Sequence, residues 1–220
     1  GVIRDGFLAE VATDTLRFEN AGLIAASSRE WGVALQIEHE LLSSDADEES
    51  GLPEIAASNL TVVNSGTIEG SMVIDAETVD ATIDNSGSIV RAARAVDQTN
   101  FMTFAYGGEA ALEIYNSTDP DQRFVFTNSG TIRNDERGGS AVDMEIEAGE
   151  EDDGHIGSAD VRVVNTGSIV AAGGATVVPG QLIGMPQEMV LVNPVAALNV
   201  DASDVTGTST IRIENGTDGV

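Results

Sequence analysis

A single motif, apolar-x-apolar-x-Asn-(Ser/Thr)-Gly-x-Ile, recurs along the chain and limits the folds that are open to it. Internal repetition of this kind is typical of solenoids, in which each repeat buries its apolar face only against its neighbours. The first copy has Ala21 at the hydroxyl position, and the sixth departs from the motif after Asn215. The six copies occupy residues 16–24, 60–68, 81–89, 124–132, 161–169 and 211–215.

Each position of the motif has a physical role. The alternating apolar residues predict a strand with one buried face, and the Ile predicts a return of the chain to the core. Asn followed by Gly suits a sharp turn that needs positive φ. On stacked coils each Asn amide can donate to the next and accept from the previous, so we expect a structural ladder. The ladder residues are Asn20, Asn64, Asn85, Asn128, Asn165 and Asn215, with turn glycines Gly22, Gly66, Gly87, Gly130 and Gly167.

The spacing of the motif asparagines indicates the coil length. Successive intervals are 44, 21, 43, 37 and 50 residues, and the shortest is the bare coil. A weaker pattern of small residues follows the turn, at 33–37, 110–114, 141–144 and 196–200, so the simplest count is two strands per coil. These features predict an all-β fold, a right-handed parallel β-helix (solenoid) with coils of about 21 residues and extruded loops.

The longer intervals predict loops that leave the coils at turns. We expect four inserts, at about 39–58, 98–108, 145–158 and 173–194. Solenoids place variable and functional segments in such loops. The chain is predicted to be a single β-helix segment over 1–220, and because Gly1-Val2-Ile3 matches the second half of the motif, we expect it to be cut from a longer solenoid.

Composition excludes several classes of function. The chain has 10 basic residues, all Arg, against 37 acidic ones, and its net charge of −27 repels the phosphates of nucleic acids. The absence of Cys removes disulfides, thiolate metal sites and cysteine nucleophiles. No apolar run approaches the roughly 20 residues that a membrane helix needs, so we expect no membrane-spanning segment in this stretch.

The turn sequences Asn64-Ser-Gly-Thr-Ile68, Asn85-Ser-Gly-Ser-Ile89 and Asn128-Ser-Gly-Thr-Ile132 resemble those of the β-helical passenger regions of bacterial autotransporters and related haemagglutinin-like surface proteins. The resemblance spans roughly Leu16 to Asn215, interrupted by the inserts. It implies an extracellular location or one on the bacterial outer-membrane surface, with roles in adhesion, aggregation or biofilm formation. It assigns no binding residues, because the same fold carries adhesins, proteases, lyases and tailspikes.

An enzyme has less support in the residues, and we expect none. A polysaccharide hydrolase or lyase needs two or three acids that converge on one face, usually with sugar-stacking aromatics. The only histidines, His39 and His155, lie in acidic inserts without a nucleophile elbow, so we expect both to be exposed and to form no catalytic triad. The acids that neighbouring coils could bring together are Asp75, Asp80, Asp84, Asp97, Asp143 and Glu145.

Two acidic runs concentrate the oxygen ligands that Ca²⁺ prefers. Glu150, Glu151, Asp152 and Asp153 form the candidate calcium site, and residues 45–49 form a similar run. Neither run matches an EF-hand or the glycine-rich calcium repeat, and a solvated loop is the simpler interpretation of a like-charge run. No other cofactor is expected.

Two apolar inserts, 101–106 and 177–192, suggest contacts either with a partner or with the flank of the solenoid itself. A partner would be a second copy, another surface protein or a glycan. The combined expectation is a cell-surface or secreted scaffold for adhesion, self-association or surface assembly, as a homo-oligomer or fibre-like assembly. A polysaccharide-processing enzyme and a structural filament or surface-layer subunit stay open as alternatives.

Overall fold

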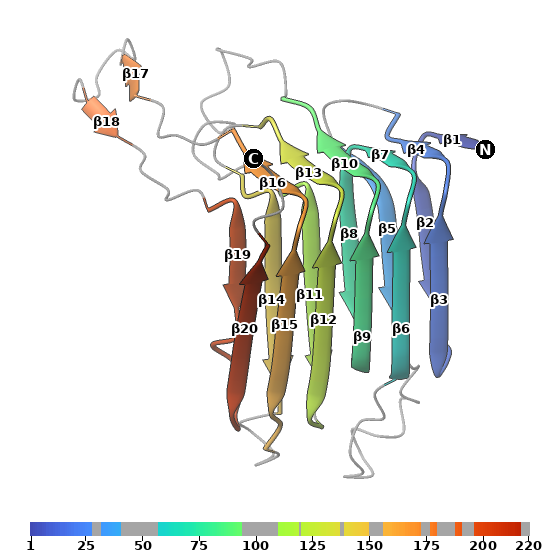
Figure 1. Ribbon diagram of the computed structural model, residues 1–220, viewed down its shortest axis with the longest axis vertical. Coiled ribbons are helices and arrows are strands. Elements are labelled where there is room, and N and C mark those ends of the chain that lie inside the picture. The colour runs from blue at the N-terminus through green and yellow to red at the C-terminus, as the bar shows by residue number, and fades with distance from the viewer. Residues whose placement is uncertain are drawn as a thin grey trace.

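Short strands with alternating apolar residues form three parallel sheets of six strands each (Figure 1). The computed structural model describes residues 1–27, 32–40, 57–93, 110–118, 120–136, 139–149, 156–172, 177–179, 188–190 and 196–216. Sheet A contains β1 (Val2–Arg4), β4 (Leu23–Ala25), β7 (Thr67–Glu69), β10 (Ser88–Arg91), β13 (Thr131–Asn134) and β16 (Ser168–Ala171). Sheet B contains β2 (Phe7–Val11), β5 (Val33–His39), β8 (Ser71–Ala76), β11 (Leu112–Thr118), β14 (Val142–Ala148) and β19 (Leu198–Asp201). Sheet C contains β3 (Thr15–Asn20), β6 (Ala57–Asn64), β9 (Thr78–Asn85), β12 (Gln122–Asn128), β15 (Ala159–Asn165) and β20 (Ser209–Asn215).

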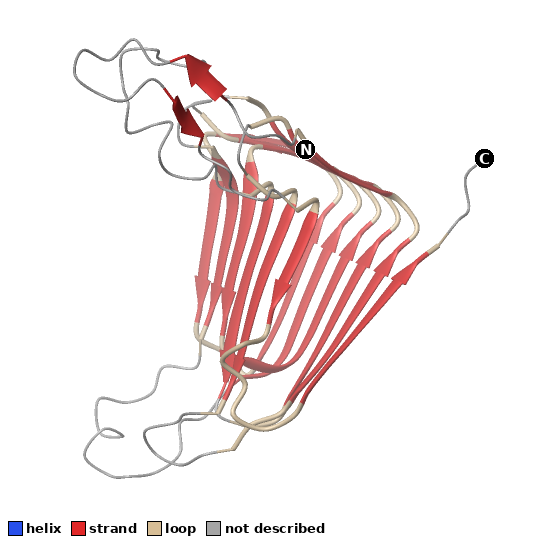
Figure 2. Cartoon of the chain, turned by 90° about the vertical axis from the view of Figure 1, so that its left-hand side faces the viewer, coloured by secondary structure: helices blue, strands red, loops and turns tan. Residues whose placement is uncertain are grey.

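Each coil contributes one strand to sheet A, one to sheet B and one to sheet C, in that order. Figure 2 shows sheets B and C as two long walls whose strands run in opposite directions, with the short strands of sheet A across one end. The parallel β-solenoid predicted from the repeat is confirmed. The count of two strands per coil is wrong, because the Ile that ends each motif lies on a strand of its own, as Ile68 does in β7.

One coil lies between successive motif asparagines, whatever the interval, because the strands that carry them are immediate neighbours in sheet C. The extra residues lie between successive strands of the stack, mainly after β5, β10, β14 and β16. Three expected insert limits are wrong: His39 ends β5, residues 57–58 begin β6, and residues 145–148 complete β14. The insert expected at 98–108 lies outside the described residues. Within the insert at 173–194, β17 (Val177–Pro179) and β18 (Glu188–Val190) pair antiparallel.

The core is narrow and is filled by stacked rows of side chains. In sheet A the motif isoleucines of successive coils are in register, and Ile68, Ile89 and Ile132 are at most 1% exposed. Phe124 and Phe126 of β12 are the largest apolar side chains in the interior. Small and β-branched residues pack well at this width, because each faces a similar residue one coil away. This geometry explains an aromatic fraction of only 4%.

The corner between sheets C and A, here called the ladder corner, carries the motif turn (residues Asn-x-Gly of each copy). The expected ladder is present: the Nδ2 atom of each motif asparagine donates to the Oδ1 atom of the next, at 2.7 to 2.9 Å. Asn20, Asn64, Asn85 and Asn128 are buried. Because each buried amide has both a donor and an acceptor partner, the stack leaves few polar groups unsatisfied in the interior.

The turn glycines are needed because successive coils approach closely. The expectation of positive φ is wrong, since none of the motif asparagines or of these five glycines has one. A Cβ atom added to Gly130 would lie 2.0 Å from the carbonyl oxygen of Gly87, and one added to Gly87 would lie 2.0 Å from that of Gly66. The backbone of each turn therefore rests directly on the turn below, and Thr131 N donates to Gly87 O at 2.9 Å.

The corner between sheets B and C, here called the network corner, contains a buried histidine. His39 has 0% exposed surface, which corrects the expectation that it is exposed. Its Nε2 atom lies 2.8 Å from Thr13 O and its Nδ1 atom 3.3 Å from Thr78 Oγ1. A neutral ring that donates from Nε2 and accepts at Nδ1 satisfies both contacts. His39 is therefore a structural residue. His155 lies outside the described residues.

The same corner holds a second group of buried polar residues, in which Asn116 and Gln122 lie two coils beyond His39. Asn116 Nδ2 donates to Thr78 O at 3.0 Å and also to Gln122 Oε1, while Asn116 Oδ1 accepts from Thr78 N at 3.2 Å. Gln122 Nε2 in turn donates to Glu147 O. This network joins β9, β11, β12 and β14. Unlike the ladder asparagines, its residues do not recur from coil to coil.

Candidate functional site: the acidic face of sheet B

The outward face of sheet B carries acidic residues in register on successive coils. The alternating burial of its strands turns every second side chain to solvent. One row consists of Glu10, Glu38, Asp75, Tyr115, Glu145 and Asp201. A second row contains Glu113 and Asp143. Since parallel strands lie about 4.8 Å apart, neighbouring carboxylates of a row repeat at roughly that spacing, except where Tyr115 separates Asp75 from Glu145.

The six strands of sheet B contain no Lys or Arg, and their one histidine, His39, is buried, so the strands themselves supply no cation to the acidic face. Sheet C differs, because its outward face mixes both signs. There Arg17 pairs with Glu19, and Arg162 pairs with Glu214 on the next coil through two hydrogen bonds of 3.1 Å. The negative charge of the described strands is thus concentrated on one wall of the solenoid.

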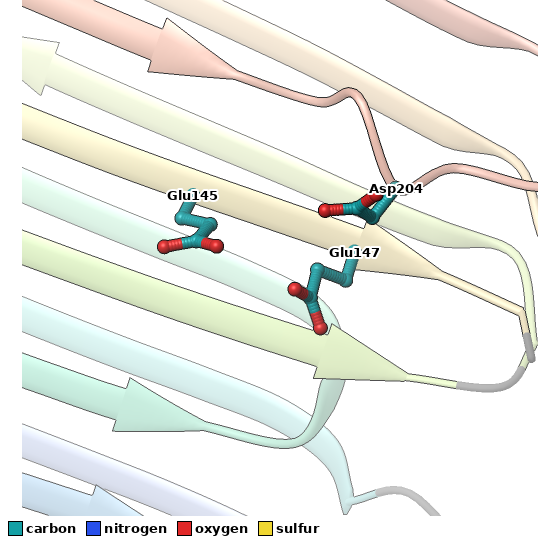
Figure 3. Close-up of side chains that lie close together, drawn as sticks. All are labelled: Glu145, Glu147 and Asp204. Atoms are coloured by element: carbon teal, nitrogen blue, oxygen red, sulfur yellow. The ribbon is translucent and has the colours of Figure 1, made fainter.

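Three carboxylates converge at one end of the acidic face (Figure 3). One ligand oxygen from each of Glu145, Glu147 and Asp204 lies within 4.8 Å of the others. Glu145 and Glu147 are on β14, and Asp204 follows β19 on the next coil. Tyr115 Oη on β11 donates to Glu147 Oε2 at 2.6 Å, which orients that carboxylate from the opposite side.

The electrostatics follow from burial and from like charge. Burial raises the pKa of Glu145, and the neighbouring carboxylates of Glu147, Asp201 and Asp143 raise it further. Burial, with the hydrogen bond to Glu147, raises the pKa of Tyr115 to about 12, so its hydroxyl stays a donor at neutral pH. A carboxylate cluster without a cation of its own favours either a bound proton or a bound hard cation.

Oxygen ligands suit Ca²⁺, which takes six to eight of them. Glu145, Glu147 and Asp204 supply three carboxylates, so water or other groups would complete the shell. Glu145 and Glu147 come shortly before the expected calcium site in the sequence. That site, Glu150, Glu151, Asp152 and Asp153, lies outside the described residues, and so does the acidic run at 45–49.

The structure separates the acids that the sequence grouped as candidates. Asp75, Asp143 and Glu145 face outward from sheet B, whereas Asp80 and Asp84 lie on β9 in sheet C, and Asp97 is outside the described residues. Glu147 and Asp204 were not predicted. The alternation Asp143-x-Glu145-x-Glu147 signals a one-sided acidic strand, but only the fold shows that Asp204 meets it.

Comparison with protein-family models, curated proteins and solved structures finds no match. Within the described part of the chain, no helix has the length and apolarity needed to cross a membrane.

Proposed function

We propose that this chain is a non-catalytic scaffold on the bacterial cell surface or in the extracellular medium, which serves adhesion, self-association or surface assembly. The observation that carries the proposal is the constancy of the coils. Each of the three sheets keeps one strand per coil and an almost unbroken register across intervals of 21 to 50 residues. Such a fold is suited to holding variable loops and flat faces at fixed spacing along a stiff body.

The acidic face of sheet B supports an assembly role. Like charges at about 4.8 Å spacing repel a second copy of the same face unless cations lie between them. A divalent cation shared between carboxylates would remove that repulsion, and Glu145, Glu147 and Asp204 form the place where oxygens already converge. The partners proposed are a second copy, another surface protein or a glycan. The location outside the cell is proposed from the resemblance of the turn motif to autotransporter passengers.

The test is size-exclusion chromatography with light scattering, with and without calcium, on the full chain and on a chain that lacks residues 177–192. We expect reversible association that depends on calcium or on this insert. The double variant E145Q/D204N should lose the calcium response, whereas the matched variant D80N/D84N on sheet C should keep it. A monodisperse monomer under every condition would contradict the proposal.

A polysaccharide-processing enzyme is a second candidate, favoured by one observation. Glu145 has a raised pKa beside Glu147, as a general acid next to a carboxylate would have, and Tyr115 lies against the pair. The assay is the release of reducing ends or unsaturated products from neutral and acidic polysaccharides. Activity that is lost in Glu145→Gln and kept in Asp80→Asn would favour the enzyme, and no cleavage by the wild-type chain would exclude it for those substrates.

A further inference from the structure

The outward face of sheet C sorts its charged residues by sign into two rows along the solenoid. The alternating burial of its strands turns to solvent the residues that lie three positions and one position before each ladder asparagine. The first row consists of Arg17, Thr61, Thr82, Val125, Arg162 and Arg212. The second row consists of Glu19, Val63, Asp84, Thr127, Val164 and Glu214. The first row therefore holds three arginines and no acid, and the second holds three acids and no base.

The six uncharged positions of these rows are all threonine or valine, in equal number. Branching at Cβ restricts such side chains to few rotamers, so they lose little conformational entropy when another surface packs on them. Sheet C forms one wall of the solenoid in Figure 1, and in Figure 2 no other described strand lies over the outer side of that wall. The face is therefore stiff, and the described strands leave it uncovered.

The charges of the two rows cancel, on a chain whose net charge is −27. A third outward row, nearer the network corner, has Asp80, Arg123 and Asp160 as its charged residues and adds one net negative charge. The acidic face of sheet B lies on the opposite wall, about 10 Å away, and counterions at physiological ionic strength screen charges beyond about 8 Å. Of the two long walls, sheet C is thus the one on which a second copy of the same chain meets little repulsion.

We propose that two copies of this chain pack face to face through sheet C, about a two-fold axis that runs parallel to the solenoid axis. This inference rests on the proposed scaffold function and names its partner as a second copy. The axis reverses the strand direction and keeps the order of the coils, so the first row of each copy lies over the second row of the other. Every pairing in such an isologous contact occurs twice.

The resulting pairings are complementary along the whole face. Arg17 lies opposite Glu19 of the second copy, the equivalent residues of β20 pair likewise, and Thr82 lies opposite Asp84. No charged residue of the two rows meets a residue of its own sign, and the third row lies opposite the uncharged residues of the ladder turns. Arg17 and Glu19 also pair within one copy, but their side chains remain 58% and 59% exposed and can take a second partner.

The size of the face fits a specific but reversible contact. Six strands about 4.8 Å apart, each about 20 Å long, cover roughly 600 Å² on each copy. The pair would bury about 1,200 Å² in total, which is the lower end of the range for stable protein–protein interfaces. We therefore expect a dimer that dissociates on dilution.

Substitution of Thr82, in the middle of the face, tests the pairing in both directions. Thr82→Arg places an arginine opposite Asp84 of the second copy and should tighten association at least about fivefold, whereas Thr82→Glu places a like charge there and should weaken it at least about tenfold. The matched controls are Thr131→Arg and Thr131→Glu, which make the same changes at an exposed position of β13 in sheet A and should associate like the wild type. The measurement is sedimentation velocity over a concentration series in EDTA at physiological ionic strength, with melting curves to confirm folding.

A charge swap tests the two-fold axis. Arg17→Glu and Glu19→Arg each place two like-charge pairs in the dimer, so each variant should associate at least about tenfold more weakly than the wild type. The double variant R17E/E19R restores opposite charges at both pairs and should associate like the wild type. A double variant as weak as either single variant would overturn the proposal.

Three further outcomes separate this interface from the scaffold function. A wild-type chain that stays monomeric in EDTA would overturn the proposal, as would Thr82 variants that shift association no more than the Thr131 variants do. Association that needs calcium or residues 177–192 but ignores the sheet C variants would leave the scaffold function standing and would overturn face-to-face packing. A dimer that follows the Thr82 variants, and that neither calcium nor the insert changes, supports the packing and fails the test of the scaffold function given above.

Discussion

The ladder corner and the network corner both turn the chain between sheets, but they satisfy their buried polar groups in different ways. At the ladder corner the same asparagine and glycine return in each coil, and every amide bonds to its own equivalent. At the network corner His39, Asn116 and Gln122 each occur once and bond to unlike partners. The repeated corner sets the distance between coils along the stack, whereas the irregular corner joins particular coils.

This difference has an energetic consequence. A ladder asparagine serves two neighbours, so its loss leaves a buried donor on one coil and a buried acceptor on another. Each ladder glycine lies against the backbone of the adjacent coil. That backbone, unlike a side chain, cannot rotate to make room for an added Cβ atom. Residues of the network corner contact flexible side chains as well as backbone, so their replacement leaves more room for adjustment. We therefore expect the ladder corner to be the less tolerant of the two.

The largest effect is expected for Gly130→Ala. The added Cβ would lie 2.0 Å from Gly87 O, so the stacked turns at Gly87 and Gly130 must separate and lose ladder hydrogen bonds. We expect a loss of more than about 4 kcal/mol in the free energy of unfolding, or failure to fold. Ser129→Ala, at the exposed neighbouring position, should change it by less than about 0.5 kcal/mol. Urea unfolding followed by circular dichroism measures both, and equal stability of the two variants would show that the turns are not closely stacked.

Asn85→Ala should follow in size. Asn85 is 2% exposed, accepts from Asn64 at 2.8 Å and donates to Asn128 at 2.7 Å. Leaving both partners unsatisfied is expected to cost about 2 to 5 kcal/mol. Asn215→Ala removes an exposed amide with one ladder partner and should cost less than about 1 kcal/mol. A similar cost at the two positions would mean that burial of the ladder contributes little to stability.

The sequence predicts the ladder corner well and the network corner poorly, for a physical reason. Each coil stacks on a coil like itself, so the ladder asparagines, such as Asn64 and Asn85, can be recognised in the sequence because they recur. The network residues and the carboxylate cluster have partners that the fold alone brings close: His39 meets Thr13, and Glu145 meets Asp204 across 59 positions of sequence. Even at the ladder corner, the reason for the glycine was missed, because the close approach of two backbones leaves no trace in one coil's sequence.

Asn116→Ala tests the network corner directly. Asn116 is 1% exposed, and its removal leaves Thr78 N and the side chain of Gln122 without this partner. We expect a loss of about 1 to 3 kcal/mol, smaller than for Asn85→Ala, because Gln122 Oε1, which accepts from Asn116, can turn toward another donor. The measurement is the urea midpoint of both variants under the same conditions. A cost for Asn116→Ala that exceeds that of Asn85→Ala would reverse the proposed order of the two corners.

The smallest effect expected is the pH response of His39. Burial lowers the pKa of His39 from its ordinary value of 6.5, although the Thr13 carbonyl and the charge of Asp14 oppose the shift. The unfolded chain therefore takes up a proton near pH 6.5 before the folded chain does. Stability from the neutral ring is complete above pH 6.5 and decreases as the pH falls through that value. His39→Gln should remove this part of the pH dependence, measured as unfolding free energy between pH 8 and pH 5.

The acidic face contributes a pH dependence of stability opposite in sign to that of His39. Burial raises the pKa values of Asp75 and Glu145, so the folded chain binds protons there more readily than the unfolded chain. The stability that these two carboxyl groups contribute is fully present at a pH below their ordinary pKa values and is lost as the pH rises. Stability from sheet B therefore increases on acidification. The wild type and His39→Gln share this contribution. The difference between their pH profiles therefore isolates the histidine, and parallel profiles would show that burial at the network corner does not disfavour the charged ring.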